Sequence, residues 1–150
     1  MVFCYTATNK TKIFADILGK ILDRPIYMLE SELDPSSKVS FAVSAIFKNS
    51  IPVTNIPYTV DDEEIYICGP VWRGRPAGTI RYFLENAPIK GKKVNMLLTA
   101  AVSHMKYCDK GINMIESAGC IPGTVEVFAS QAKSETEPEI IEAHIRELFT

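Results

Sequence analysis

The stretch "VFCYTATNKTKIFADIL", residues 2–18, decides the fold, because a strand pattern passes directly into a helix pattern through a polar turn. Residues 2–6 are short, mostly apolar and β-prone, as in a strand that is buried on both faces. Over residues 11–22 apolar side chains recur every three or four positions, which predicts an amphipathic helix. The chain therefore opens with a buried strand and a covering helix, the unit from which parallel sheets are built.

The same alternation continues to the end of the chain. Further strands are expected at residues 25–30, 64–70, 92–100 and 123–129. Further helices are expected at residues 37–49, after the turn-forming "DPSS", and at residues 77–87, 105–119 and 136–148. Thr136 and Glu139 have the spacing of a capping box, and Pro138 falls in the first turn of the last helix. Five strands alternating with five helices predict a single α/β domain, residues 1–150, built as a three-layer, doubly wound, five-stranded parallel sheet.

Composition and charge exclude several classes of protein. The 150 residues, 47% of them hydrophobic, are enough for one well-buried core. Sixteen basic and 18 acidic residues give a net charge of -2, which argues against a nucleic-acid-binding surface. No apolar run approaches the ~20 residues of a membrane-spanning helix, and the first residues lack a signal-peptide pattern. We therefore expect a cytoplasmic protein that contacts neither membranes nor nucleic acid.

The four cysteines give no sign of a metal site. They contain no Cys-x-x-Cys pair, and neither histidine stands at metal-ligand spacing from them. We expect free thiols, as in a reducing compartment, with Cys4 and Cys68 acting as small core residues.

The turn "TATNKT", residues 6–11, is a candidate anion site. A helix N-terminus offers unpaired backbone N–H groups and the positive end of the helix dipole, and both favour a negative ligand. Thr6, Thr8 and Thr11 could add three hydroxyl donors for a phosphate group. The alternative is that one threonine caps the helix and the others only pack. The turn is neither a Walker P-loop nor a Gly-x-Gly-x-x-Gly dinucleotide turn.

The third expected strand runs into "GPVWRGRPAG", residues 69–78, which holds the only tryptophan. Trp72 could stack on a flat heteroaromatic ring, and Gly74 would let the backbone approach the edge of that ring. The alternative is that Trp72 simply covers the edge of the sheet. In a doubly wound sheet this loop and the threonine turn would lie side by side, where ligands of such folds bind.

With these two loops the chain resembles the flavodoxin family over nearly its whole length. "TATNKT" looks like the phosphate loop of that family, a Thr/Ser-x-Thr-Gly-x-Thr pattern, and "GPVWRGRPAGTIRYFL" looks like its second flavin loop and the helix that follows. The resemblance implies the strand order 2-1-3-4-5, which is that of flavodoxin itself. It also implies an FMN cofactor. The implied phosphate contacts are Thr6, Ala7, Thr8, Asn9, Lys10 and Thr11, and the implied ring contacts are Pro70, Val71, Trp72, Arg73 and Gly74.

Two positions depart from the family pattern. Asn9 replaces the usual glycine of the phosphate loop, which is tolerable because asparagine enters the left-handed backbone region more readily than most residues. The third flavin loop would be expected to carry glycines and often an aromatic residue, but here it reads "TAAVSHM", residues 99–105. Thr99, Ala100 and Ala101 could still present backbone groups to the pyrimidine edge of the flavin. One face of the ring would then stay open for a substrate or a second planar molecule.

Charge distinguishes this chain from the acidic flavodoxins. Its acidic run "DDEE", residues 61–64, precedes the third strand and is expected at the opposite end of the sheet from the ligand site. Basic side chains fall in or beside the three loops, where they would attract acidic or phosphorylated molecules. These residues are Lys10, Arg73, Arg75, His104 and Lys106.

Three functions remain open from the sequence. The first is flavin-mediated electron transfer with a redox partner protein, which needs no catalytic side chain because the flavin carries the chemistry. The second is an FMN-dependent oxidoreductase that takes electrons from NAD(P)H and reduces a quinone or a similar small acceptor, with a homodimer completing the site. The third is a flavin-free domain of the same fold. The first two leave a monomer and a homodimer both open.

Overall fold

The computed structural model describes residues 1–32, 50–129 and 137–150. Its strands are β1 (Val2–Cys4), β2 (Ile26–Met28), β3 (Glu64–Trp72), β4 (Arg75–Pro76), β5 (Lys93–Ala100) and β6 (Ile121–Ala129). Its helices are α1 (Lys10–Leu22), α3 (Gly78–Asn86), α4 (Met105–Ser117) and α5 (Pro138–Phe149). The helix expected at residues 37–49 and Thr136 of the expected capping box lie outside the described residues.

The sheet order confirms the expected doubly wound topology. Five parallel strands run in the order β2-β1-β3-β5-β6, which is 2-1-3-4-5 when only these five are counted. The chain steps outward from β1 to β2 and then in the opposite direction through β3, β5 and β6, so the winding reverses between β1 and β3. The short β4 was not expected, and it pairs antiparallel with the end of β3.

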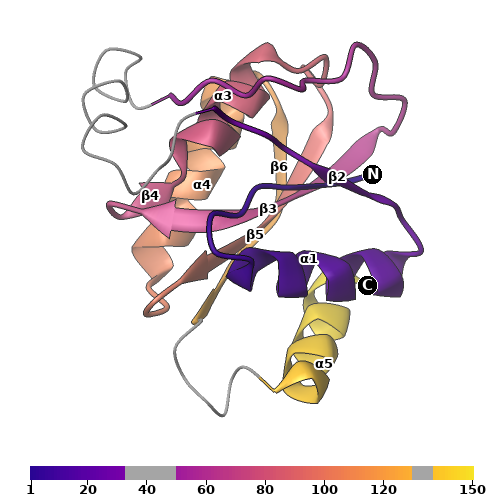
Figure 1. Cartoon of the computed structure of the whole chain (residues 1–150), viewed down its shortest axis with the longest axis vertical. Helices are drawn as coiled ribbons and strands as arrows, with labels where there is room; N and C mark the ends of the chain where they lie inside the picture. Colours follow the sequence, from indigo (N-terminus) through magenta and orange to yellow (C-terminus); the bar gives the residue numbers. More distant parts are fainter. Residues whose placement is uncertain (33–49, 130–136) are drawn as a thin grey trace.

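Helices cover both faces of the sheet, as Figure 1 shows. On one face, α3 and α4 bury Ile80, Phe83 and Ile115 against Phe3, Ile67 and other strand residues. On the other face, α1 and α5 bury Phe14, Leu18, Ile141 and Ile145 against Val2, Cys4 and Leu97. Neighbouring residues of one strand, such as Phe3 and Cys4, enter opposite layers because side chains of a strand alternate between its faces.

The start of the last helix differs in detail from the expected one. Pro138 is the first residue of α5, as predicted, but the residue at the N-cap position is Glu137, whose side chain makes no capping hydrogen bond. Glu139 lies in the first turn of α5, and the capping box stays a prediction because Thr136 lies outside the described residues. Within the described residues, no helix is both long and apolar enough to cross a membrane.

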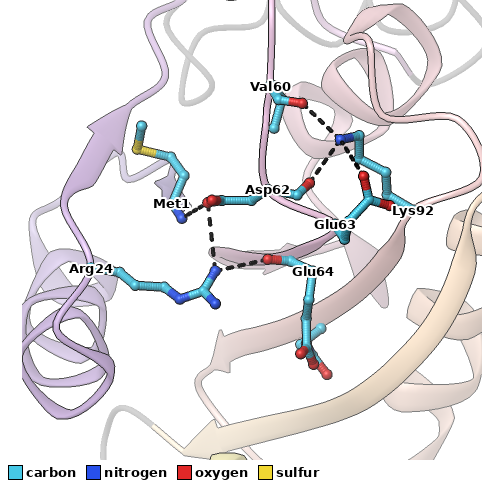
Figure 2. Close-up of polar contacts among 8 residues, drawn as sticks. Met1, Arg24, Val60, Asp62, Glu63, Glu64 and Lys92 are labelled. Carbon is cyan, nitrogen blue, oxygen red and sulfur yellow. Dashed lines mark hydrogen bonds and ion pairs between the residues drawn. The ribbon is translucent and has the colours of Figure 1, made fainter.

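The acidic run lies at the amino ends of the strands, as expected, where Asp62 and Glu63 form ion pairs (Figure 2). The Asp62 carboxylate accepts a hydrogen bond from the Met1 ammonium group and lies 3.5 Å from the Arg24 guanidinium group. Arg24 also donates to the Glu64 carbonyl oxygen at 2.9 Å. Lys92 donates to the carbonyl oxygens of Val60 at 2.7 Å and Asp62 at 2.8 Å. These contacts tie the segment before β3 to β1 and to the start of β5.

This network predicts that the protein loses stability in acid. The Met1 ammonium group holds the pKa of Asp62 below its usual value, and hydrogen bonds from Lys93 and Asn95 lower the pKa of Glu64. A carboxyl whose pKa is lower in the folded chain stabilises the fold above its unfolded pKa, and that contribution disappears as the pH falls. We expect the urea midpoint to drop between about pH 5 and about pH 3.

The size of the acid effect should be small for each group. The side chains of Asp62 and Glu64 are 40% and 36% exposed, so solvent screening limits each contribution to less than about 1 kcal/mol. Urea unfolding followed by circular dichroism at several pH values would measure it. Asp62→Asn should flatten part of the pH dependence, whereas Asp109→Asn on exposed α4 should leave it unchanged. An equal effect of the two substitutions would contradict this assignment.

Candidate functional site

Three loops meet at the carboxyl edge of the sheet, next to the reversal of winding. Cys4, the last residue of β1, pairs with Cys68 of β3, which pairs in turn with Leu97 of β5. From these paired positions β3 continues to Trp72 and β5 to Ala100, on the side where the first loop leaves β1. The rings of Tyr5 and Trp72 lie 5.6 Å apart in an edge-to-face contact between the first and second loops. The hydroxyl groups of Thr11 and Thr99 lie 2.8 Å apart and join the first helix to the end of β5. The expected juxtaposition of the three loops is thus present.

The first loop combines an exposed surface with one unsatisfied hydroxyl group. Ala7, Thr8, Asn9 and Lys10 are exposed, and Asn9 has the left-handed φ of 61° that the missing glycine of this loop requires. The Asn9 side chain makes no capping hydrogen bond to α1. Thr6 is only half-buried as a residue, yet its Oγ1 is buried and has no hydrogen-bond partner. A buried hydroxyl without a partner is unfavourable, so this atom marks a place where a ligand could supply one.

Thr11 has a different role from the other threonines. Its side chain is 2% exposed, and its hydroxyl is already hydrogen-bonded to Thr99, which is 4% exposed. Only part of its hydrogen-bonding capacity therefore remains for a ligand. Among the residues that the structure describes, Thr79 Oγ1 is the other buried side-chain oxygen that lacks a partner. Thr79 is 0% exposed, however, so a ligand cannot reach it as easily as Thr6.

The second loop is a β-hairpin that extends past the end of β1 (Figure 1). Trp72 pairs with Arg75, and the two residues between them, Arg73 and Gly74, both have positive φ, 55° and 77°. Two consecutive positive φ values define the type I′ turn that suits tight hairpins. Trp72 is half-buried and packs on the core layer that contains Tyr5. The indole is thus held edge-on by Tyr5 while part of it stays accessible.

Substitution of Arg73 is expected to stabilise the protein. An arginine strains the left-handed backbone region, whereas asparagine is favoured at the first position of a type I′ turn. Arg73→Asn should therefore raise the free energy of unfolding by about 0.5–1 kcal/mol. Urea unfolding of the apoprotein would measure this gain. Arg75→Asn is the matched control, because it removes the same charge outside the turn and should give no gain; equal changes would show that backbone strain is not responsible.

The third loop and the start of α4 complete the edge. Thr99 and Ala100 end β5 and are buried, whereas residues 101–104 are all exposed. His104 occupies the N-cap of α4, where its Nδ1 accepts a hydrogen bond from the Lys106 backbone N–H at 3.1 Å. This contact gives the histidine a structural role that the sequence did not indicate.

Sequence reasoning missed Tyr107 in the first turn of α4. Its ring lies 5.6 Å from the His104 ring, and its Cε1 would lie 3.8 Å from a Cβ placed on Gly74. An aromatic residue thus stands beside the hairpin, although the third loop itself lacks one. The sequence does contain a signal for Tyr107: an aromatic residue in the first turn of the helix that follows the fourth parallel strand.

Cys4 and Cys68 belong to the core and not to a reactive site. Cys4 and Cys68 face the layer formed by α1 and α5 and are completely buried. Burial raises the pKa of Cys4 to about 12 and that of Cys68 well above its usual value, so neither is a thiolate near neutral pH. Within residues 1–32, 50–129 and 137–150, no group of three His, Cys, Asp or Glu side chains is placed to hold a metal ion.

A separate hollow lies between β6 and α5. Its volume is about 200 Å³, and its walls include Ser103, Glu126, Phe128 and His144. The rings of Phe128 and His144 lie 4.9 Å apart. None of the predicted cofactor residues lines this hollow, so it is distinct from the three-loop edge.

Known proteins resemble this chain clearly in structure but only weakly in sequence. No protein-family model matches the chain, and no curated protein is significantly similar to it in sequence. Solved structures do match, among them a flavoprotein of Lactobacillus acidophilus in complex with FMN, with a TM-score of 0.67 and 21% identity over 91% of this chain and 97% of that one.

Two other matches extend over nearly complete chains. A Bacteroides eggerthii protein assigned as a flavoprotein has a TM-score of 0.74 and 16% identity, covering 99% of this chain and 96% of its own. The flavodoxin of Megasphaera elsdenii has a TM-score of 0.57 and 13% identity, covering 98% of this chain and 99% of its own. The chain therefore has the flavodoxin-like fold.

Proposed function

We propose that this protein binds FMN at the three-loop edge and takes part in electron transfer through the bound flavin. The observation that carries the proposal is Thr6 Oγ1, a buried hydroxyl without a partner in the loop between β1 and α1, beside the reversal of winding. A phosphate oxygen would satisfy this group, and helix N-termini favour such anions. The similar fold of a flavoprotein that holds FMN supports the same assignment.

The residues of the first loop fit the phosphate group. Thr6 and Thr8 would donate hydrogen bonds from their hydroxyls. The backbone N–H groups from Ala7 to Thr11 would donate as well, since they lie before and in the first turn of α1. That turn contains no acidic residue to repel the phosphate. Lys10 adds a positive charge at the exposed rim. Thr11 would contribute mainly through its backbone and by anchoring the loop to Thr99.

The other two loops fit a flat ring. Pro70, Val71 and Trp72 end β3 with half-buried side chains, and Arg73 and Gly74 form the turn beyond them. Thr99, Ala100 and Ala101 bring the end of β5 to the same edge. FMN, when bound, supplies one- and two-electron redox chemistry, so the protein itself needs to bind and orient it and to leave part of it accessible.

The exposed third loop keeps a second function open. Residues 101–104 are all exposed, which leaves room for a small molecule next to the proposed ring site. This favours, as the alternative, an FMN-dependent oxidoreductase that uses NAD(P)H to reduce a quinone or a similar acceptor. Steady oxidation of NADPH by FMN-loaded protein with a quinone would support this alternative, and its absence would favour exchange with a protein partner.

Titration of the apoprotein with FMN and with riboflavin tests the proposal. Flavin fluorescence should be quenched on binding, and FMN should bind at least about tenfold more tightly, because riboflavin lacks the phosphate. Thr8→Ala should weaken FMN binding by roughly 1–3 kcal/mol and leave riboflavin binding almost unchanged. Equal affinity for the two flavins would contradict the proposed phosphate site. Failure to bind either flavin would indicate a flavin-free domain of this fold.

A further inference from the structure

The three loops of the carboxyl edge carry positive charge only. Residues 5–11, 69–80 and 99–108 contain no Asp or Glu, although the whole chain has a net charge of -2. They contain four Lys and Arg residues, which we call the cationic rim: Lys10, Arg73, Arg75 and Lys106. Among the described residues, Lys10, Arg75 and Lys106 form no ion pair, whereas Asp62 and Glu63 before β3 are paired with Arg24 and Lys92. The acidic run is thus offset by its own cations, whereas Lys10, Arg75 and Lys106 have no acidic partner within the part of the chain that the structure describes.

The fold itself does not favour these positions for cations. Lys10 is the first residue of α1 and Lys106 the second of α4, where the positive end of the helix dipole disfavours a cation. The N-terminus of α5, by contrast, has Glu139 in its first turn. Arg73 lies in the left-handed backbone region, which disfavours arginine. Three of the four rim residues therefore oppose local stability, and such conflicts concentrate at functional surfaces.

Exposed apolar side chains lie within the same edge. Val102 and Met105 are 69% and 83% exposed, and both are within four residues of Lys106. Tyr107 brings the first turn of α4 against the hairpin that carries Arg73 and Arg75. Apolar contact groups flanked by charges of one sign are the composition of a surface that docks a protein of opposite charge.

We propose that the cationic rim, together with Val102 and Met105, docks an acidic face of a partner protein with which the bound flavin exchanges electrons. The inference rests on the proposed flavin function, since it names the partner of that site. A bound FMN phosphate would offset at most two of the four charges. Arg75 and Lys106 lie outside the proposed flavin contacts and would keep the edge positive. The cations come from three separate loops, which favours a protein face over a small anion.

The docking surface can be tested on the apoprotein, so its result does not depend on flavin binding. The probe is a plant-type [2Fe–2S] ferredoxin, an acidic redox protein, with binding measured by calorimetry. We expect its Kd to rise at least about tenfold between about 20 mM and about 200 mM salt, as for contacts between opposite charges. Absence of ferredoxin binding at low salt, in a protein that still binds FMN, would overturn the docking proposal alone.

Paired charge reversals locate the surface. Arg75→Glu with Lys106→Glu should weaken ferredoxin binding at least about tenfold. Lys20→Glu with Lys90→Glu changes the net charge equally at exposed sites away from the edge and should change the Kd less than about twofold. Glutamate is favoured at a helix N-terminus, so Lys106→Glu should not unfold α4. The milder pair Arg75→Gln with Lys106→Gln should give a smaller loss in the same direction.

Two results would overturn the inference. Equal weakening by the rim pair and the control pair would show that only net charge matters. Binding of tripolyphosphate that depends on Arg75 and Lys106, without ferredoxin binding, would assign the rim to a small anion and not to a protein.

Discussion

Thr6→Val should stabilise the apoprotein and weaken its binding of FMN at the same time. The Thr6 hydroxyl is buried without a partner, so replacing it by a methyl group removes an unfavourable desolvated polar atom. We expect the free energy of unfolding of the apoprotein to rise by about 1 kcal/mol. The same substitution removes a donor to the phosphate group, so FMN binding should weaken by roughly 1–3 kcal/mol, about 10- to 100-fold in Kd.

Thr11→Val is the matched control for this substitution. The Thr11 hydroxyl is buried and hydrogen-bonded to Thr99 at 2.8 Å, so its loss leaves a buried oxygen unpartnered. The apoprotein should then lose about 1–3 kcal/mol, in the opposite direction from Thr6→Val. Urea unfolding and FMN titration of both variants would measure the two effects. A loss of apoprotein stability in Thr6→Val, or unchanged FMN affinity, would mean that Thr6 is an ordinary packing residue.

The sheet and its order were predictable from the sequence because each element carries a local pattern. The alternation of buried strands with amphipathic helices predicted all five parallel strands within a few residues of their observed bounds, and resemblance to a known family supplied their order. Asn9 was also predictable, since its left-handed conformation is a property of the residue type and of the loop. The helix at residues 37–49 remains a prediction, because it lies outside the described residues.

The contacts that build the site were not predictable, because they depend on tertiary placement. β4 has only two residues, one of them Pro76, and forms because β3 runs on past β1 and needs a partner there. The Thr11–Thr99 contact joins residues 88 positions apart, and no local sequence pattern predicts it. His104 was expected only as one of the basic side chains beside the loops, but its Nδ1 accepts a hydrogen bond from the Lys106 N–H and caps α4.

Asn95 is a fourth feature that only the structure reveals, and its substitution is expected to give the largest change in stability. It lies in a strand at an irregularity in the β5–β6 register, between Val94 and Met96. Its side chain is 3% exposed, its Nδ2 donates to Glu64 Oε1 at 2.8 Å, and its Oδ1 accepts from the Thr124 N–H at 2.8 Å. The amide therefore replaces the backbone pairing that the irregular register interrupts.

Asn95→Leu should lower the free energy of unfolding by about 3 kcal/mol, because it leaves the half-buried Thr124 N–H unpaired and removes a partner of Glu64. Leucine would also be crowded by Gly123. The two positions are so close that a Cβ added to the glycine would lie 2.2 Å from Asn95 Oδ1. Asn113→Leu on the exposed side of α4 is the control and should change stability by less than about 0.5 kcal/mol. Urea unfolding would compare the two.

Asn95→Asp separates the two hydrogen bonds of this side chain. Aspartate still accepts from the Thr124 N–H, but it cannot donate to Glu64 and places a second carboxylate beside it. Repulsion should raise the pKa of the new carboxyl above its unfolded value, so the variant should be destabilised at pH 7 and should recover relative to the wild type as the pH falls through that pKa. If the deficit stayed constant from pH 7 to pH 4, the lost stability would come from packing around β5 and β6 and not from the polar contact with Glu64.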